Sequence, residues 1–341
     1  MALKSLVSPL MGKTVLPSAV VVIMIASALL LFSLFSDHYK QLTAIRDTMV
    51  EAVASLLPAG NGHDRLERFL RRVLFAPAFY VLMTGILLLE VFIPAKRAQR
   101  PFSPALLHDF MWHVLQLWIF FALQGSFIQL LYVVYDNCLS FLTIQAVKEW
   151  PALWLTPLAI LLSDFLAWSH HLLRHKVRWL WIFHTVHHSQ SHLNAWTDSR
   201  YHLVDYLAAE LVRFLPLFML QLNPFAIWWY GFVGVWHARL YHANIHSNFG
   251  VFRYVLVTPQ SHRVHHSVHP THQDTNFGAL FSVWDQLFRT QYRDSEVYPD
   301  TGVNEKDFPL ETHWRSVLSL KPLLAQQFYP FTRIWSSAKQ P

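Results

Sequence analysis

Charged residues and cysteine are both scarce in this chain of 341 residues. Asp, Glu, Lys and Arg together make up only 14% of the sequence, whereas an ordinary soluble domain has about 25%. The single cysteine, Cys138, excludes a disulfide framework and a metal site built from thiolates. The net charge of +6 is modest and lies in segments that flank apolar runs. We interpret it as charge at a membrane surface and expect no nucleic-acid partner.

Long apolar runs account for the low charge and predict membrane-spanning helices. The first run, Leu16–Ser36, is about as long as a bilayer is thick. We interpret it as a retained anchor, because no small-x-small cleavage site follows it. Basic residues at the ends of two later runs indicate a cytoplasmic location for those ends, while the topology of the first 100 residues stays open. The further predicted spans are Val73–Ala95, Leu106–Tyr135, Trp150–His170 and the region Leu207–Tyr241, which is long enough for two spans or a hairpin broken at Asn223-Pro224.

Histidine, in contrast, is abundant, with 21 residues against 21 Asp and Glu together. Three clusters stand out, one with the spacing HxxxH and two with the spacing HxxHH. On an α-helix, residues three and four apart lie on one face, so each cluster can present two or three imidazoles to a metal. The clusters are His171 with His175; His184 with His187 and His188; and His262 with His265 and His266.

Eight imidazoles exceed the ligand number of a single ion and favour a centre of two metals. Imidazole binds Fe, Cu, Zn and Ni in preference to Mg or Ca. A structural zinc site needs only about four ligands. The zincin protease pattern requires Glu directly after the first histidine, where this chain has Leu172.

The sequence around the clusters resembles a known family in four stretches, which together cover about residues 150–293. The stretches are Asp164–His175, Leu180–Ser189, Val257–Ser267, and Asp274–Gly278 followed by Trp284–Phe288. They are similar to the histidine boxes of the fatty acid hydroxylase / sterol desaturase superfamily of membrane-bound di-iron oxygenases. Phe277 stands where that family usually has Tyr, and Arg289 where it has Gly.

The resemblance implies a di-iron centre with histidine ligands that uses O₂ to hydroxylate or desaturate a membrane lipid, such as a sterol, fatty acyl chain, ether lipid or amino lipid. Asp164 is implied as a residue that orients a ligand imidazole, or as a buried acid that pairs locally. The implied ligands are His171, His175, His184, His187, His188, His242, His262, His265 and His266, with His246, His202 and His170 as additional candidates. The remaining histidines, including His108, His113 and His237, are expected to have structural roles.

These patterns predict an all-α fold: an integral membrane helical bundle with a cytosol-facing, histidine-rich catalytic cap. We divide the chain into residues 1–149, a membrane region with about three transmembrane helices; residues 150–293, the hydroxylase-like catalytic region; and residues 294–341, a C-terminal tail. The expected location is the bacterial inner membrane or the eukaryotic endoplasmic reticulum, with the site on the cytoplasmic side.

Electrons for O₂ chemistry must come from outside the chain. No G-x-G-x-x-G nucleotide-binding pattern and no haem domain is recognisable in the sequence. An external electron-transfer partner, a reductase or a pterin, is therefore implied. The alternative is a membrane metal-binding or transport protein without redox chemistry. Its ligands should lie in mid-span, whereas the histidine clusters here follow the apolar runs.

Overall fold

The computed structural model describes residues 77–338, apart from 223 and 312, together with a few residues between 44 and 67. The chain divides into two compact units, residues 1–89 with 249–251, and residues 90–248 with 252–341. All regular elements in the described ranges are helical, and β structure there is limited to three isolated bridges. The all-α prediction is therefore confirmed for this part of the chain.

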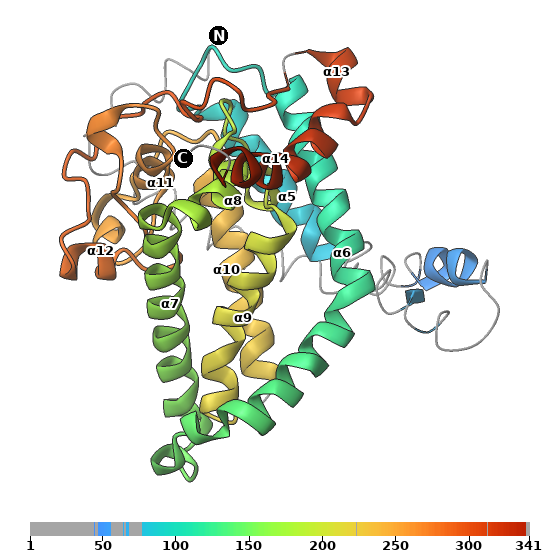
Figure 1. Cartoon of the computed structure of the whole chain (residues 1–341), viewed down its shortest axis with the longest axis vertical. Coiled ribbons are helices and arrows are strands. Elements are labelled where there is room, and N and C mark those ends of the chain that lie inside the picture. The colour runs from blue at the N-terminus through green and yellow to red at the C-terminus, as the bar shows by residue number, and fades with distance from the viewer. Residues whose placement is uncertain are drawn as a thin grey trace. The chain divides into compact units, whose positions relative to one another are not determined.

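The larger unit contains the histidine clusters and most of the helices (Figure 1). The α-helices between residues 77 and 338 are α5 (Pro77–Phe92), α6 (Pro104–Val134), α7 (Ala152–Lys176), α8 (Arg178–His188), α9 (Leu203–Met219), α10 (Pro224–His242), α11 (Pro259–His265), α12 (Val283–Leu287), α13 (Trp314–Leu318) and α14 (Lys321–Ala338). The short π and 3₁₀ turns are η3 (Tyr135–Leu139), η4 (Ser140–Leu142), η5 (Gln145–Val147), η6 (Thr197–Ser199), η7 (Gly250–Tyr254) and η8 (Pro270–His272).

Two packing cores hold the elements around the clusters. Helix α7 packs along α9, and a buried group of aliphatic residues that includes Leu155, Ala159 and Leu217 joins them. Helix α14 packs against α8 and α6, and Trp112 of α6 donates from Nε1 to Oε1 of Gln326 at 3.1 Å. As a result, α8 is held from two sides at the end of α7 that carries His171 and His175 (Figure 1).

The apolar runs are helical where the structure describes them, but the predicted transmembrane helices are not confirmed. Among the residues described, none of the helices combines the length and the apolar character that a membrane crossing requires. Helix α5 has only 16 residues, and the predicted break at Asn223-Pro224 divides the 207–241 region into α9 and α10, of 17 and 19 residues. Helix α7 contains Pro157 and the buried acid Asp164. The first predicted run, Leu16–Ser36, lies outside the described residues.

The short helix α11 starts as its sequence predicts. Thr258 is the N-cap, its side chain accepts from the backbone N–H of Ser261, and the Ser261 side chain bonds back to Thr258 to complete a capping box. Pro259 occupies the first helical position, where no N–H is needed. These local signals fix the orientation of the seven-residue helix that carries His262 and His265 and is followed by His266.

Candidate metal centre

Nine histidine side chains converge into two buried groups. Within each group, the ligand-capable nitrogen atoms lie within 4.8 Å of one another. The first group is His171, His175, His184, His188 and His265; the second is His187, His242, His262 and His266. The structure thus brings together all nine residues that the sequence assigned as principal ligands, from helices α7, α8, α10 and α11 and the residue that follows α11.

The HxxHH spacing divides each box between the two groups. In α8, the first and last histidines (His184 and His188) join the first group, and His187 joins the second. In the 262–266 box the assignment is reversed, because His262 and His266 join the second group and His265 the first. Residues i+3 and i+4 both lie near residue i, but on opposite sides of it around the helix axis. One box can therefore serve two adjacent ions.

Outer hydrogen bonds orient the imidazoles of the first group. Nδ1–H of His171 donates to the carbonyl of Phe277 at 2.9 Å, and Nδ1–H of His265 donates to that of Thr275 at 2.8 Å. His184 donates from Nδ1 to Oδ2 of Asp205 at 2.8 Å. Each bond leaves the lone pair on Nε2, as in metal-bound histidines. All five Nε2 atoms of this group are buried and have no hydrogen-bond partner among the described residues.

The hydrogen bonds of the second group indicate more directly that the site needs a cation. His187 and His242 both use Nδ1–H on backbone carbonyls, those of Arg200 (3.2 Å) and Ala238 (2.8 Å). Their facing Nε2 atoms, 3.2 Å apart, are therefore both acceptors. Nε2 of His262 lies 2.8 Å from that of His242 and 3.0 Å from that of His266. A cation between these lone pairs would turn the repulsion into coordination. The donor set thus fits a metal.

The protonation state of the imidazoles also suits a metal. Burial lowers the pKa of all nine, to about 4 for His265, to about 3 for His242 and well below the ordinary value for the other seven. Neighbouring charges add to this effect, for example that of Arg174 beside His184. The side chains are therefore neutral at pH 7, which is the form that binds metal ions.

Two acids play roles that differ from the sequence-based hypotheses. The oxygens of Asp164 accept from the backbone N–H groups of Leu280 and Phe281 and from Nε1 of Trp284. These bonds tie α7 to the 280–284 segment, and none of them orients an imidazole. Asp205 has that role instead, on His184. It lies 21 residues from its partner, and no motif marks it.

The segment after the third box shapes the wall of the site. Asp285 accepts from the backbone N–H groups of Phe277 and Gly278, and so positions the Phe277 carbonyl that holds His171. A Cβ on Gly278 would lie 2.7 Å from Val257 Cγ2 and 2.8 Å from the carbonyl oxygen of Phe281. Only glycine fits this close approach, which explains its place in the motif.

The three additional candidate histidines lie outside both groups. His246 is exposed and stacks on Tyr298, with ring centroids 4.1 Å apart. His202 uses both nitrogens elsewhere: Nδ1 accepts from Val204 N as the N-cap of α9, and Nε2–H donates to the Gln327 carbonyl. His170 belongs to neither group. Direct ligand roles for these three are not supported by their positions.

A third cluster, which the sequence did not reveal, surrounds Arg200. His108, Asp109 and Glu311 place their ligand-capable atoms within 4.8 Å of one another. The Arg200 guanidinium bonds Asp109 at 2.9 Å and Glu311 at 2.7 and 2.9 Å, and lies 3.1 Å from His108 Nδ1. This cluster therefore already contains a cation. The Arg200 carbonyl accepts from His187, which connects the cluster to the centre.

Comparison with known proteins bears directly on this centre. Residues 156–290, which include all nine converging histidines, match the family model described as Fatty acid hydroxylase. The chain is 29% identical over 215 residues to ornithine lipid hydroxylase OlsE of Rhizobium tropici, covering 62% of this chain and 61% of that protein.

Two further relatives match shorter regions. Alkylglycerol monooxygenase of Caenorhabditis elegans is 27% identical over 141 residues, which is 41% of this chain and 28% of that protein. Cholesterol 25-hydroxylase of Rattus norvegicus is 29% identical over 134 residues, which is 39% of this chain and 45% of that protein. The matches therefore span less than two-thirds of the length of each relative. No solved structure matches the chain significantly.

Proposed function

Because the chain belongs to the fatty acid hydroxylase family through residues 156–290, we propose that it is an O₂-dependent oxidoreductase that hydroxylates a membrane lipid at a centre of two iron ions. The observation that carries the proposal is the convergence of nine neutral imidazoles into two adjacent groups. The first metal would be held by the five-histidine group and the second by the four-histidine group.

Iron is the metal that best fits both the donor set and the relatives. Imidazole suits Fe, Cu, Zn and Ni, but zinc has no redox chemistry and prefers about four ligands. The named relatives are hydroxylases and a monooxygenase, whose reactions require electron transfer. When bound, iron would supply the activation of O₂ that is needed to oxidise an unactivated C–H bond. Electrons would come from an external partner, a reductase or a pterin.

The protein's own contribution is to orient the imidazoles and to exclude water. Tyr201 stacks on His187 with ring centroids 4.4 Å apart, and the ring centroid of Tyr241 lies 4.2 Å from that of His262. Phe277 is fully buried against His171 and His175. These aromatic side chains surround the groups with apolar surface, which limits side reactions of an oxidising centre with water.

The relatives, which by name act on ornithine lipid, alkylglycerol and cholesterol, support a lipid substrate. Their names favour hydroxylation over desaturation. We also infer that the protein resides in the bacterial inner membrane or in the membrane of the endoplasmic reticulum, with the metal centre on the cytoplasmic side. The low charge content and the apolar run Leu16–Ser36 support this location. Retention in the pellet after alkaline carbonate extraction would test it.

Lipid analysis of a deletion strain complemented with wild type or variants tests the proposed reaction. We expect a lipid with a mass gain of 16 Da for hydroxylation, or a loss of 2 Da for desaturation, that depends on the wild-type chain. His187→Ala and His265→Ala remove one member of each group and should abolish the product. His246→Ala, on an exposed histidine outside both groups, is the matched control.

Product formation at the wild-type level in either group variant would contradict the proposal. Metal binding without any lipid oxidation would favour the alternative of a metal-binding or transport protein.

A further inference from the structure

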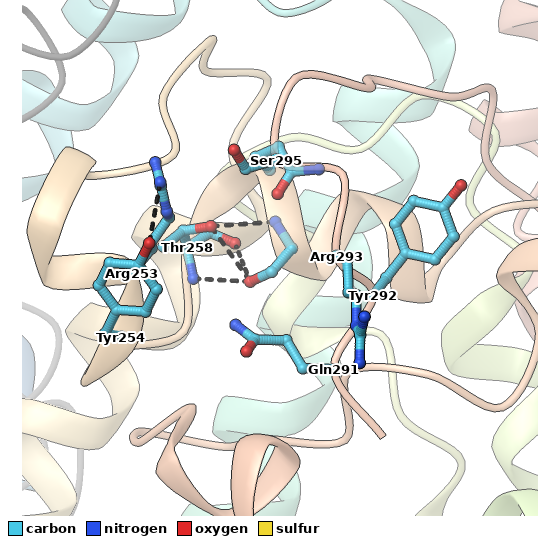
Figure 2. Close-up of a pocket in the computed structure, with 9 residues that line it drawn as sticks. Arg253, Tyr254, Thr258, Gln291, Tyr292, Arg293 and Ser295 are labelled. Carbon is cyan, nitrogen blue, oxygen red and sulfur yellow. Dashed lines mark hydrogen bonds between the residues drawn. The ribbon is translucent and has the colours of Figure 1, made fainter. Parts of the chain in front are cut away.

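A polar cavity of about 180 Å³ lies beside the start of α11 (Figure 2). Its walls come from two segments, residues 253–261 and 291–295. Two arginines line the cavity and none of its nine lining residues is acidic, so its formal charge is +2. The other lining residues are Tyr254, Thr258, Gln260, Ser261, Gln291, Tyr292 and Ser295, which supply hydroxyl and amide groups.

The two arginines have no carboxylate partner among the described residues. The Nη2 atom of Arg253 donates to the Tyr254 hydroxyl at 3.2 Å, and Arg293 is exposed. The nearest acids in the sequence are engaged elsewhere: Glu296 accepts from Nδ2 of Asn248, and Asp294 accepts from the backbone N–H of Glu296. Neither of these two acids forms an ion pair with an arginine of the cavity.

Side-chain hydrogen bonds tie the two walls together. Nε2 of Gln260 donates to the carbonyls of Asp294 and Val297, each at 3.0 Å. Asn276 bridges them a second time: Nδ2 donates to the Ser261 carbonyl at 2.9 Å, and Oδ1 accepts from Tyr292 N at 2.8 Å. Asn276 has a φ of 58°, which asparagine tolerates better than most residues. The cavity is thus a preorganised site, which lowers the entropic cost of binding.

The cavity wall and the metal centre share one short helix. Ser261 lines the cavity, and the next residue, His262, belongs to the four-histidine group. The carbonyl of Thr275, the neighbour of the bridging Asn276, accepts from Nδ1 of His265. A group bound in the cavity would therefore lie next to the elements that present His262 and His265, where the head group of an amphipathic substrate could be anchored.

We propose that this cavity binds an oxyanion, a carboxylate or phosphate, carried by the head group of the lipid substrate. Guanidinium groups bind both anions through paired N–H donors, and the side-chain amide of Gln291 lines the cavity as a further donor. The Gln260 amide and the Thr258 and Ser261 hydroxyls already donate within the walls and hold their shape. The inference rests on the proposed function and narrows its substrates to lipids with an anionic head group, as opposed to neutral lipids such as sterols.

Equilibrium binding to the full-length, metal-loaded protein in phosphatidylcholine nanodiscs tests the inference without turnover. The probes are dodecyl phosphate, inorganic phosphate and dodecanol, each measured by titration calorimetry. We expect Arg253→Gln and Arg293→Gln each to weaken dodecyl phosphate binding by roughly tenfold, the effect of one charge-assisted hydrogen bond, and to leave dodecanol binding unchanged. Arg289→Gln is the control, since this exposed arginine lies nearby but does not line the cavity.

The outcomes separate the sources of the anion. Equal affinities for inorganic phosphate and dodecyl phosphate would overturn the head-group assignment in favour of a free anion. Unchanged dodecyl phosphate binding in the double variant Arg253→Gln/Arg293→Gln would overturn the site itself. Because no product is measured, a failure of this site and a failure of the lipid-oxidation proposal are separate results.

Discussion

The histidine centre and the Arg200 cluster are both buried and both contain histidine, but their electrostatic character differs. In the Arg200 cluster, the guanidinium lies between the carboxylates of Asp109 and Glu311 and satisfies them. In the centre, the Nε2 atoms of the five-histidine group have no hydrogen-bond partner among the described residues, and Nε2 of His187 and Nε2 of His242 face each other as acceptors. These Nε2 atoms, rather than the number of histidines, identify the site that needs an added cation.

The two regions are also mechanically connected. Arg200 donates from Nε to the Val186 carbonyl and to the Ser189 hydroxyl, and its own carbonyl holds His187. The charged cluster thus fixes the C-terminal end of α8, which carries three histidines of the centre. One cluster serves as a support and the other as the site, and substitutions should separate these roles.

Arg200→Met should produce the largest loss of stability. It leaves the carboxylates of Asp109 and Glu311 buried without a cation, which typically costs about 3–5 kcal/mol. The free energy of unfolding in denaturant measures the loss, and a triple variant with Asp109→Asn and Glu311→Gln should recover much of it. The control Arg333→Met breaks an exposed pair with Asp307 and should cost less than about 1 kcal/mol. Equal losses in the two single variants would contradict a supporting role for Arg200.

Asp205→Asn should weaken metal binding by about 10- to 100-fold, the usual effect of removing an outer carboxylate partner of a ligand histidine. The substitution removes the charge that orients His184 and pairs with Arg174. Metal affinity from competition with a chelator measures it. Glu210→Gln, on the same helix but paired with Arg213, serves as the matched control. Identical affinities for the two variants would show that Asp205 has no such role.

Acid should destabilise the two regions in different pH windows. Burial holds the pKa of the centre's imidazoles below the ordinary 6.5, so below pH 6.5 the unfolded chain takes up protons that the folded, metal-free chain does not. As the pH decreases below 6.5, the free energy of unfolding should therefore fall by about 1.4 kcal/mol per pH unit for each such histidine.

Glu311 behaves differently. Burial alone would raise its pKa, but the charge of Arg200 and hydrogen bonds from His108 and Arg200 hold it below the ordinary 4.5. The contribution of the Glu311 carboxylate to the free energy of unfolding is therefore complete above pH 4.5 and declines only below that value. Denaturation of the metal-free protein at pH 7.5, 6 and 5 tests the histidine effect, and a constant free energy over this range would refute it.

The smallest effects are expected from histidines outside both groups. His246→Ala should leave metal content unchanged and alter the free energy of unfolding by no more than about 0.5 kcal/mol, since the side chain is exposed. His202→Ala should also retain the metals but cost about 1 kcal/mol through loss of the α9 N-cap. Elemental analysis measures the metal content of both variants. Loss of metal in either variant would return that histidine to the ligand set.

The features of the fold and of the site that depend on short-range periodicity were predictable from the sequence. The spacing of His184, His187 and His188 places them on α8, and Thr258 and Pro259 mark the start of α11. The nine converging histidines were identified from such boxes, together with the family resemblance that added His242. The capping, the break before Pro224 and the all-α character in the described residues follow from equally local signals.

Long-range pairings were not predictable in the same way. The contact of Asp205 with His184 depends on how α7, α8 and α9 pack, and the Arg200 cluster joins α6 to Glu311 across more than 200 residues of sequence. Asp164 carries the motif but bonds the 280–284 segment, because the fold brings that loop to α7. The division of each HxxHH box between two groups likewise requires the positions of all the helices.

Elemental quantification of the purified protein, combined with Mössbauer spectroscopy, measures how many iron ions the two histidine groups bind. We expect two iron ions per wild-type chain, and loss of bound iron in the double variant His188→Ala/His266→Ala, which removes one imidazole from each group. A wild-type chain that binds no more than one metal ion, or a double variant that retains two, would contradict it.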